Sequence, residues 1–333
     1  MQLSVIILNY NVRYFLELCV KSVLESVSSI NAEVIVVDNN SSDNSCLMLQ
    51  KVFEGQIRVV ENKENLGFSK AYNQAVENCL GEYICILNPD TVVAEDTFIK
   101  SLELLKSKKQ IGALGCRMID GLGQFLPESK RNIPSPTIAF KKILGDSKKY
   151  YASLDEKYSG YVEALAGAFI VMSKSSYIEV GGFDEDYFMY GEDIDLSLKL
   201  LKSGYKNYYF GDLTIIHFKG ESTTKNYTYA KRFYGAMYLF YKKHFKNGFL
   251  WSTLVYFMMI LLRIIYVFRK EDLAFENKLL QEKPNILSLN NLSYKELIST
   301  LDNSKTNFYI QPSGSHYAVA SWGADIKGRV IEV

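Results

Sequence analysis

Residues 83–91, Tyr-Ile-Cys-Ile-Leu-Asn-Pro-Asp-Thr, join a short apolar run to a polar turn. The run has the length of a strand that is buried on both faces. Similar apolar runs precede it at 3–8, 34–37 and 57–60, and apolar residues at helical spacing lie between them at 16–27 and 67–79. Buried strands that alternate with helices predict an α/β fold with a mainly parallel central sheet flanked by helices.

Polar side chains follow three of these predicted strands. Asn9, Asp38 and Asp90 each stand at the carboxyl end of a strand or in the turn just after it. In open parallel sheets, ligands bind beyond the carboxyl ends of the strands. The sequence therefore predicts a binding site at this edge of the sheet.

The turn Asn88-Pro89-Asp90 has two readings. A carboxylate there can ligate Mg²⁺ or Mn²⁺ together with phosphate oxygens and water, but the same residues also form ordinary turns. Asp38 likewise has two readings. It can accept hydrogen bonds from a nucleobase or a ribose, or it can form an Asx-turn or a helix cap.

An acidic cluster follows the turn Gly181-Gly182-Phe183-Asp184-Glu185. Glu192, Asp193 and Asp195 stand at the start of a predicted helix, where the helix dipole favours acidic side chains. The dipole accounts for one or two of them more easily than for three. A carboxylate at the edge of a cleft can also act as a general base toward a hydroxyl. His217 follows a short apolar run and is a candidate metal ligand, although a lone histidine is more often a polar surface residue or a satisfied core residue.

Composition narrows the function classes. The 333 residues carry a net charge of +1, which gives no reason to expect a nucleic-acid partner. All 5 cysteines fall in the first 116 residues, and none is in a CxxC pair, so a reduced, cytosolic compartment is expected. The first apolar run is too short for a signal peptide.

The second half of the chain is less regular. Residues 117–161 are predicted as a long loop, and 227–245 as an aromatic, basic helix. Residues 249–268 are almost wholly apolar, contain Arg263 and have basic flanks. This segment predicts a helix lying in the membrane interface, with a membrane span or a buried core helix as alternatives.

Taken in order, seven motifs resemble a known family. The chain is similar to family 2 glycosyltransferases with the nucleotide-sugar-binding GT-A fold, of the bacterial rhamnosyltransferase-like branch. The motifs are VIILNYN at 5–11, VVDNNSSD at 36–43, NLGFSKAYNQA at 65–75, ILNPDT at 86–91, LAGAFIVMSK at 165–174, GGFDEDYFMYGEDIDLSLKL at 181–200 and HFKGEST at 217–223. The resemblance covers roughly residues 1–245.

The resemblance implies an inverting transfer of a sugar from a nucleoside diphosphate sugar to a hydroxyl of a glycan or lipid-linked acceptor. Asp193 would be the general base, with Glu192 as the alternative. Asp90 and His217 would hold Mg²⁺ or Mn²⁺. The residues implied to bind the donor are Asn9, Asp38, Asn65, Asn88 and Arg131. Asn88 stands where the family has an aspartate, which implies a weakly held cation bridged by the diphosphate.

Two other functions remain open on this fold. A nucleotidyltransferase would carry a glycine-rich phosphate loop near the N-terminus, and residues 8–15 contain no glycine. A non-catalytic nucleotide-sugar-binding scaffold would keep the pocket without turnover. An oxidoreductase is disfavoured because no GxGxxG follows the first strand.

The expected organisation has four parts. Residues 1–115 form the nucleotide-sugar-binding half of one domain, and 116–245 its acceptor-binding and catalytic half. Residues 246–270 form a membrane-associated helix, and 271–333 a tail of unknown role. The expected location is the cytoplasmic face of the inner membrane, in polysaccharide biosynthesis.

Overall fold

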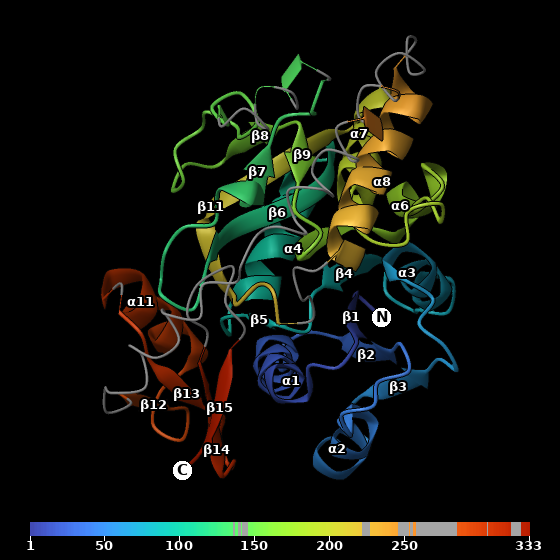
Figure 1. Cartoon of the computed structure of the whole chain (residues 1–333). Coiled ribbons are helices and arrows are strands. Elements are labelled where there is room, and N and C mark those ends of the chain that lie inside the picture. The colour runs from blue at the N-terminus through green and yellow to red at the C-terminus, as the bar shows by residue number, and fades with distance from the viewer. Residues whose placement is uncertain are drawn as a thin grey trace.

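The computed structural model describes residues 1–135, 137–138, 141, 146–221, 227–245, 253, 256–257, 285–304, 306–320 and 328–333. Its centre is a 9-stranded sheet with the strand order β3-β2-β1-β4-β10-β6-β11-β5, and β8 pairs with β11 off this path (Figure 1). A second, 4-stranded sheet, β12-β13-β14-β15, lies near the C-terminus.

The first part of the chain confirms the alternation of strands and helices. The strands β3, β2, β1 and β4 are parallel neighbours, and the register pairs Asn9 with Asp38 at the carboxyl ends of β1 and β2. The elements are β1 (Leu3–Asn9), α1 (Arg13–Val27), β2 (Ala32–Asp38), α2 (Ser45–Val52), β3 (Arg58–Glu61), α3 (Phe68–Glu77) and β4 (Tyr83–Leu87).

The second part makes the sheet mixed, so the prediction of a mainly parallel sheet was wrong for this half. β10 is antiparallel to both β4 and β6, whereas β11 is parallel to β6. Parallel pairing of consecutive strands requires a crossover, usually a helix. Helices α1, α2 and α3 supply such crossovers between β1, β2, β3 and β4.

These later elements follow in order. They are β5 (Thr91–Val92), α4 (Thr97–Ser107), β6 (Ile111–Ile119), η1 (Pro127–Ser129), β7 (Lys130–Arg131), β8 (Gly160–Val162), β9 (Ala164–Leu165), β10 (Phe169–Ser173), α6 (Lys174–Glu179), α7 (Glu192–Lys202), β11 (Lys206–His217) and α8 (Tyr227–His244). β11 is one continuous strand, and its register against β6 shifts between Phe210 and Thr214.

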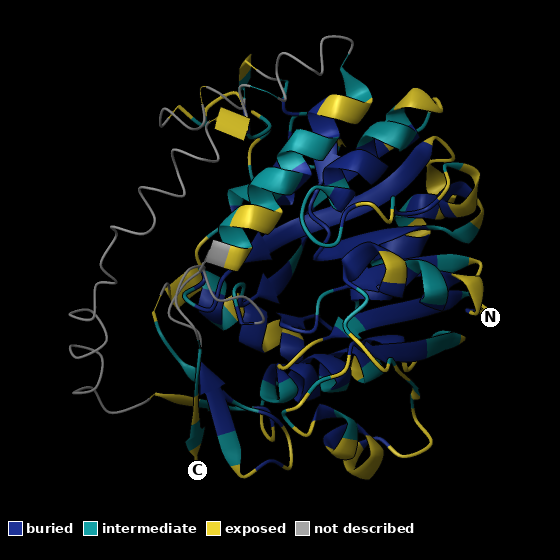
Figure 2. Cartoon of the chain, turned by 45° about the vertical axis from the view of Figure 1, so that its right-hand side comes forward, coloured by how far each residue is buried: buried dark blue, intermediate teal, exposed yellow. Residues whose placement is uncertain are grey.

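Helices cover both faces of the central sheet. Alternate residues of β1 point to opposite faces, so Val5 and Ile7 belong to one buried cluster and Ile6 to another. The first cluster contains residues of α1, α2 and α4, and the second contains residues of α3, α6 and α7. The buried strands between these two helix layers are dark in Figure 2.

The C-terminal residues form a folded unit for which the sequence predicted no elements. It consists of β12 (Ile286–Ser288), α11 (Tyr294–Ser304), β13 (Tyr309–Gln311), β14 (Tyr317–Ala320) and β15 (Arg329–Glu332). Leu297 and Leu301 of α11 share a buried cluster with Phe15 of α1. The unit is also fixed by polar contacts, since Lys21 Nζ donates to Ser313 O at 2.6 Å.

The predicted membrane-associated segment, 249–268, lies outside the described residues apart from 253, 256 and 257. None of the helices in the described part of the chain combines the length and the hydropathy that a membrane span requires. Tyr256 and Phe257 are 51% and 65% exposed.

Candidate active site

A cavity of about 470 Å³ lies at the carboxyl ends of β1, β2 and β4, where the sequence predicted a site. All of the predicted site residues except Asn9 and Asp38 line it, namely Asn65, Asn88, Asp90, Arg131, Glu192, Asp193 and His217. They come from the loop before α3, the turn after β4, β7, the first turn of α7 and the end of β11. The fold therefore brings together groups that are far apart in the sequence.

Asn9 and Asp38 are buried beneath this cavity instead of lining it. Asn9 Nδ2 donates to Asp38 Oδ2 at 2.7 Å, and the backbone N–H of Ser41 donates to Asp38 Oδ1 at 2.7 Å. Their chain neighbours Tyr10 and Asn39 do line the cavity. In this structure Asn9 and Asp38 fix the two turns that present those neighbours.

Asp90 and His217 meet because β5 pairs with the end of β11. This pairing places Thr91 opposite His217. The distance from His217 Nε2 to Asp90 Oδ1 is 3.4 Å, and from His217 Nε2 to Asn88 Nδ2 it is 3.5 Å. Both Asp90 and His217 are buried.

The donor set at this place fits a hard divalent cation that shares its shell with a diphosphate. It offers the carboxylate of Asp90, an oxygen ligand of the kind that Mg²⁺ and Mn²⁺ prefer, and the imidazole of His217, a nitrogen ligand; the atom of Asn88 nearest His217 is the amide nitrogen Nδ2. Among the described residues, no three histidine, cysteine, aspartate or glutamate side chains are grouped as a metal site. Oxygen atoms of a bound diphosphate would therefore have to complete the coordination shell of the cation.

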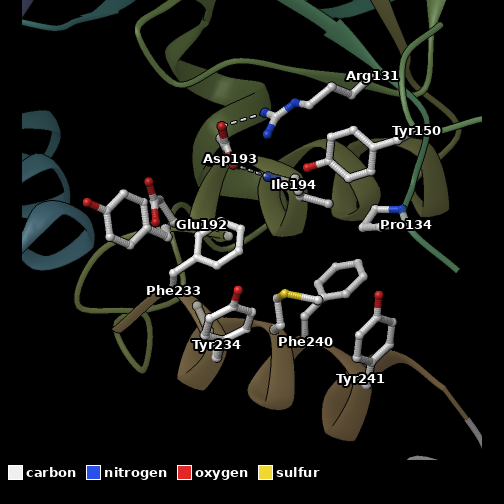
Figure 3. A pocket seen from close by; sticks show the side chains of 14 residues that line it. Arg131, Pro134, Tyr150, Glu192, Asp193, Ile194, Phe233, Tyr234, Phe240 and Tyr241 are labelled. Atoms are coloured by element: carbon white, nitrogen blue, oxygen red, sulfur yellow. Dashed lines mark hydrogen bonds and ion pairs between the residues drawn. The ribbon is translucent and has the colours of Figure 1, made fainter. Parts of the chain in front are cut away.

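Asp193 is held in place by three donors. Arg131 Nη2 donates to Asp193 Oδ2 at 2.6 Å, as the dashed line in Figure 3 shows. The backbone N–H of Gly167 donates to the same oxygen at 3.0 Å, and the N–H of Ile194 donates to Oδ1 at 2.8 Å. Asp193 stands in the first turn of α7, where the helix dipole favours a negative charge. Its carboxylate is therefore oriented before any ligand binds.

Glu192 differs from its neighbour in its environment. Burial, followed by the negative charge of Asp193, raises the pKa of Glu192 above its ordinary value. Its Oε2 atom is buried and has no hydrogen-bond partner among the described residues. A carboxyl with a raised pKa keeps its proton to a higher pH than an ordinary glutamate does. The pair thus combines a carboxylate fixed by donors with a carboxyl that can donate a hydrogen bond.

The structure adds site residues that the sequence reasoning missed. Glu128, Lys219 and Arg232 line the cavity, and Lys219 forms an ion pair with Glu128. Lys219 falls inside the motif at 217–223, so its position there was a usable signal. Glu128 lies in the irregular region after β6, where no pattern distinguished it.

A second cavity, of about 330 Å³, adjoins the first (Figure 3). Both cavities have Arg131, Tyr190, Glu192 and Asp193 in their linings. The remaining lining of the smaller cavity comes mainly from α8. The acidic pair therefore stands where the two cavities meet.

Comparison with protein families agrees with this geometry. Residues 4–181 match the family model described as glycosyl transferase family 2. The chain belongs to glycosyltransferase family 2. Residues 148–228 also match the model described as the N-terminal domain of galactosyltransferase. The family match ends before α7, and the second match includes the acidic pair.

Two curated relatives are similar to this family 2 chain. The poly-beta-1,6-N-acetyl-D-glucosamine synthase of Staphylococcus aureus (strain COL) is 29% identical over 175 residues, which are 52% of this chain and 40% of the synthase. The N-acetylglucosaminyl-diphospho-decaprenol L-rhamnosyltransferase of Mycobacterium tuberculosis is 27% identical over 212 residues, 58% of this chain and 68% of the relative. The chain thus spans less than half the length of the synthase.

Solved structures show the same fold. TarS of S. aureus, residues 1–349, has a TM-score of 0.51 at 16% identity and covers 72% of this chain and 64% of its own. The mannosyltransferase PcManGT from Pyrobaculum calidifontis, in complex with GDP-Man and Mn²⁺, has a TM-score of 0.51 at 17% identity. The match covers 90% of this chain and 84% of the mannosyltransferase chain. The α/β fold is therefore GT-A-like.

Proposed function

We propose that this chain transfers a sugar, with inversion, from a nucleoside diphosphate sugar to a hydroxyl of a glycan or lipid-linked acceptor in cell-surface polysaccharide synthesis. The observation that carries the proposal is the position of the Glu192–Asp193 pair between two cavities. The larger cavity is lined by Asp90 and His217, the candidate metal ligands. A transferase needs such an arrangement, because donor and acceptor must reach one point from different sides.

Asp193 is the proposed general base. Its carboxylate removes the proton of the acceptor hydroxyl while that oxygen forms a bond to the anomeric carbon and the bond to the diphosphate breaks. Arg131 and the N–H of Gly167 orient this carboxylate. Glu192 is the proposed donor of a hydrogen bond beside it. The two residues differ in role because their surroundings differ.

Asp90 and His217 are the proposed ligands of Mg²⁺ or Mn²⁺, with Asn88 beside them. The cation would neutralise the charge that develops on the leaving diphosphate. Asn65 and Arg131 are proposed to line the donor site, and Asn9 and Asp38 to position the turns that carry Tyr10 and Asn39. Among similar structures, one contains GDP-Man with Mn²⁺ and another contains UDP-GlcNAc.

Donor turnover tests this proposal. Purified protein is incubated with a panel of nucleoside diphosphate sugars, with Mn²⁺, Mg²⁺ or a chelator, and released nucleotide is measured. We expect cation-dependent release from one donor and its loss in Asp193→Asn, which should still bind the nucleotide. Nucleotide binding without turnover on any donor and acceptor mixture would support a non-catalytic scaffold instead.

Membrane association of residues 246–270 is a separate proposal, supported by the apolar composition and the basic flanks. It would place the enzyme at the cytoplasmic face of the inner membrane. The exposed residues Tyr256 and Phe257 allow a test in the full chain. Replacing both by serine should reduce co-sedimentation with anionic vesicles, whereas Tyr158→Ser, at a site that is 68% exposed, should not. Equal sedimentation of both variants would contradict the proposal.

A further inference from the structure

The smaller cavity has one apolar wall, formed by α8. Phe233, Tyr234, Met237, Phe240 and Tyr241 of this helix line it, and Figure 3 shows the labelled aromatic rings directed into the space. None of these residues belongs to a motif that the sequence analysis used. Cavities with apolar walls and a few polar groups are typical small-molecule sites.

The facing wall carries the charged groups of the site. It contains Arg131, Glu192 and Asp193. Arg131 is the one lysine or arginine among the described residues of this lining, and Asp193 already pairs with it at 2.6 Å. No positive charge of this wall is left over for a phosphate, so its charge favours a neutral ligand. Its carboxyl oxygens can hydrogen-bond to hydroxyl groups.

One polar atom in the apolar wall has no partner. Tyr241 is 1% exposed, and its hydroxyl forms no hydrogen bond within the described part of the chain. A buried hydroxyl without a hydrogen bond costs free energy. A ligand hydroxyl in the cavity would supply that bond.

The wall is fixed to the rest of the site at the end of α8. His244 Nε2 lies 2.6 Å from Asp195 Oδ1, which belongs to the first turn of α7. Lys243 Nζ lies 2.5 Å from Asp184 Oδ2 and 2.6 Å from Asp186 Oδ2. The acidic residues that flank the base therefore anchor α8. A fixed wall lowers the ordering cost of binding.

We propose that this cavity binds one uncharged sugar ring of the acceptor, an inference that rests on the proposed transferase function. The ring lies with its apolar C–H face against α8. Its hydroxyl edge faces Glu192 and Asp193, which brings one hydroxyl to the proposed base. A sugar ring suits this space because it combines apolar faces with a polar edge.

Binding of neutral methyl glycosides tests the proposal without knowledge of the natural acceptor. Saturation-transfer NMR is recorded on the full chain with UDP or GDP and a panel of methyl pyranosides, and with octyl phosphate as a charged, apolar probe. We expect at least one methyl pyranoside to bind and octyl phosphate not to compete with it. Binding of octyl phosphate alone, or of no methyl pyranoside, would overturn the proposal.

Variants of α8 localise the binding. Met237→Trp fills the cavity and should weaken glycoside binding by about tenfold or more, while calorimetry shows unchanged affinity for the nucleotide. Lys242→Trp adds the same side chain at an exposed position of the same helix that does not line the cavity, and should bind the glycoside as the wild type does. Equal binding by both variants would refute the location.

Tyr241→Phe is a milder second variant in case the larger side chain disturbs folding. It removes the unpartnered hydroxyl and should weaken glycoside binding by a few-fold, about what one hydrogen bond contributes. Unchanged glycoside affinity would contradict the role of this hydroxyl. A wild type that binds neither UDP nor GDP would instead count against the proposed function itself.

Discussion

Replacing Asp193 by asparagine tests the proposed base together with its ion pair. Asparagine has almost the same size, but it cannot take a proton from the acceptor hydroxyl. Loss of a general base costs about 10²- to 10⁴-fold in turnover. Nucleotide affinity should not change, because the substitution leaves the proposed metal ligands and the other residues of the proposed donor site in place.

The structure also predicts a loss of stability. The side chains of Arg131 and Asp193 are 10% and 14% exposed and 2.6 Å apart, so the substitution leaves a buried guanidinium without its counter-charge. Removal of one partner of a buried ion pair costs about 3–5 kcal/mol. The amide oxygen of asparagine can still accept from Arg131, which also donates to Leu165 O at 2.6 Å. We therefore expect the lower part of this range, about 3 kcal/mol.

Denaturant unfolding and donor turnover are measured on the same preparations. Asp212→Asn is the matched control, because Asp212 is exposed on β11 and does not line either cavity. It should change the free energy of unfolding by less than about 0.5 kcal/mol. In an Arg131→Met background, Asp193→Asn should no longer destabilise the protein, because no buried cation loses its partner.

Two results would refute this reasoning. Turnover by Asp193→Asn above about a tenth of the wild-type rate would exclude Asp193 as the base. An unchanged free energy of unfolding would show that the ion pair with Arg131 does not form in solution.

Three further predictions concern other parts of the molecule. Glu192 has a pKa raised above 4.5, so the folded chain holds a proton that the unfolded chain releases, and stability falls as the pH rises from 4.5 through the raised value. Glu192→Gln should flatten this decline in unfolding measured from pH 5 to 8, and an unchanged decline would contradict the assignment. Asp90→Asn should weaken Mn²⁺ binding in the presence of nucleotide by about tenfold, as titration calorimetry would show; an unaltered affinity would exclude Asp90 as a ligand. Gly123→Ala should destabilise the chain more than Gly55→Ala. Both glycines have a φ near +72°, so the backbone strain of the two substitutions is similar. However, a Cβ at Gly123 would lie 1.9 Å from Leu301 O, whereas a Cβ at Gly55 would have nothing within 4 Å. Thermal unfolding compares the two variants, and an equal loss of stability in both would mean that α11 does not pack against Gly123.

Much of the fold and part of the site follow from local patterns in the sequence. Apolar runs separated by helical periodicity predicted β1, β2, β3 and β4 and their parallel orientation, which the structure confirms. The carboxyl ends of parallel strands meet at one edge, so Asp90 could be placed at a site before any coordinates were known. The start of α7 was equally readable, because its acidic first turn and its apolar spacing are properties of neighbouring residues.

Only the tertiary structure decided which distant groups touch. Arg131 reaches Asp193 across 62 residues, and the α8 wall faces the acidic pair, although no local pattern relates these elements. Asp38 stands at the predicted strand end, yet its bonds to Asn9 and Ser41 keep it below the cavity surface. Periodicity reports which face of an element is buried. The partner of that face depends on how the whole chain packs, and that is a property of long-range contacts alone.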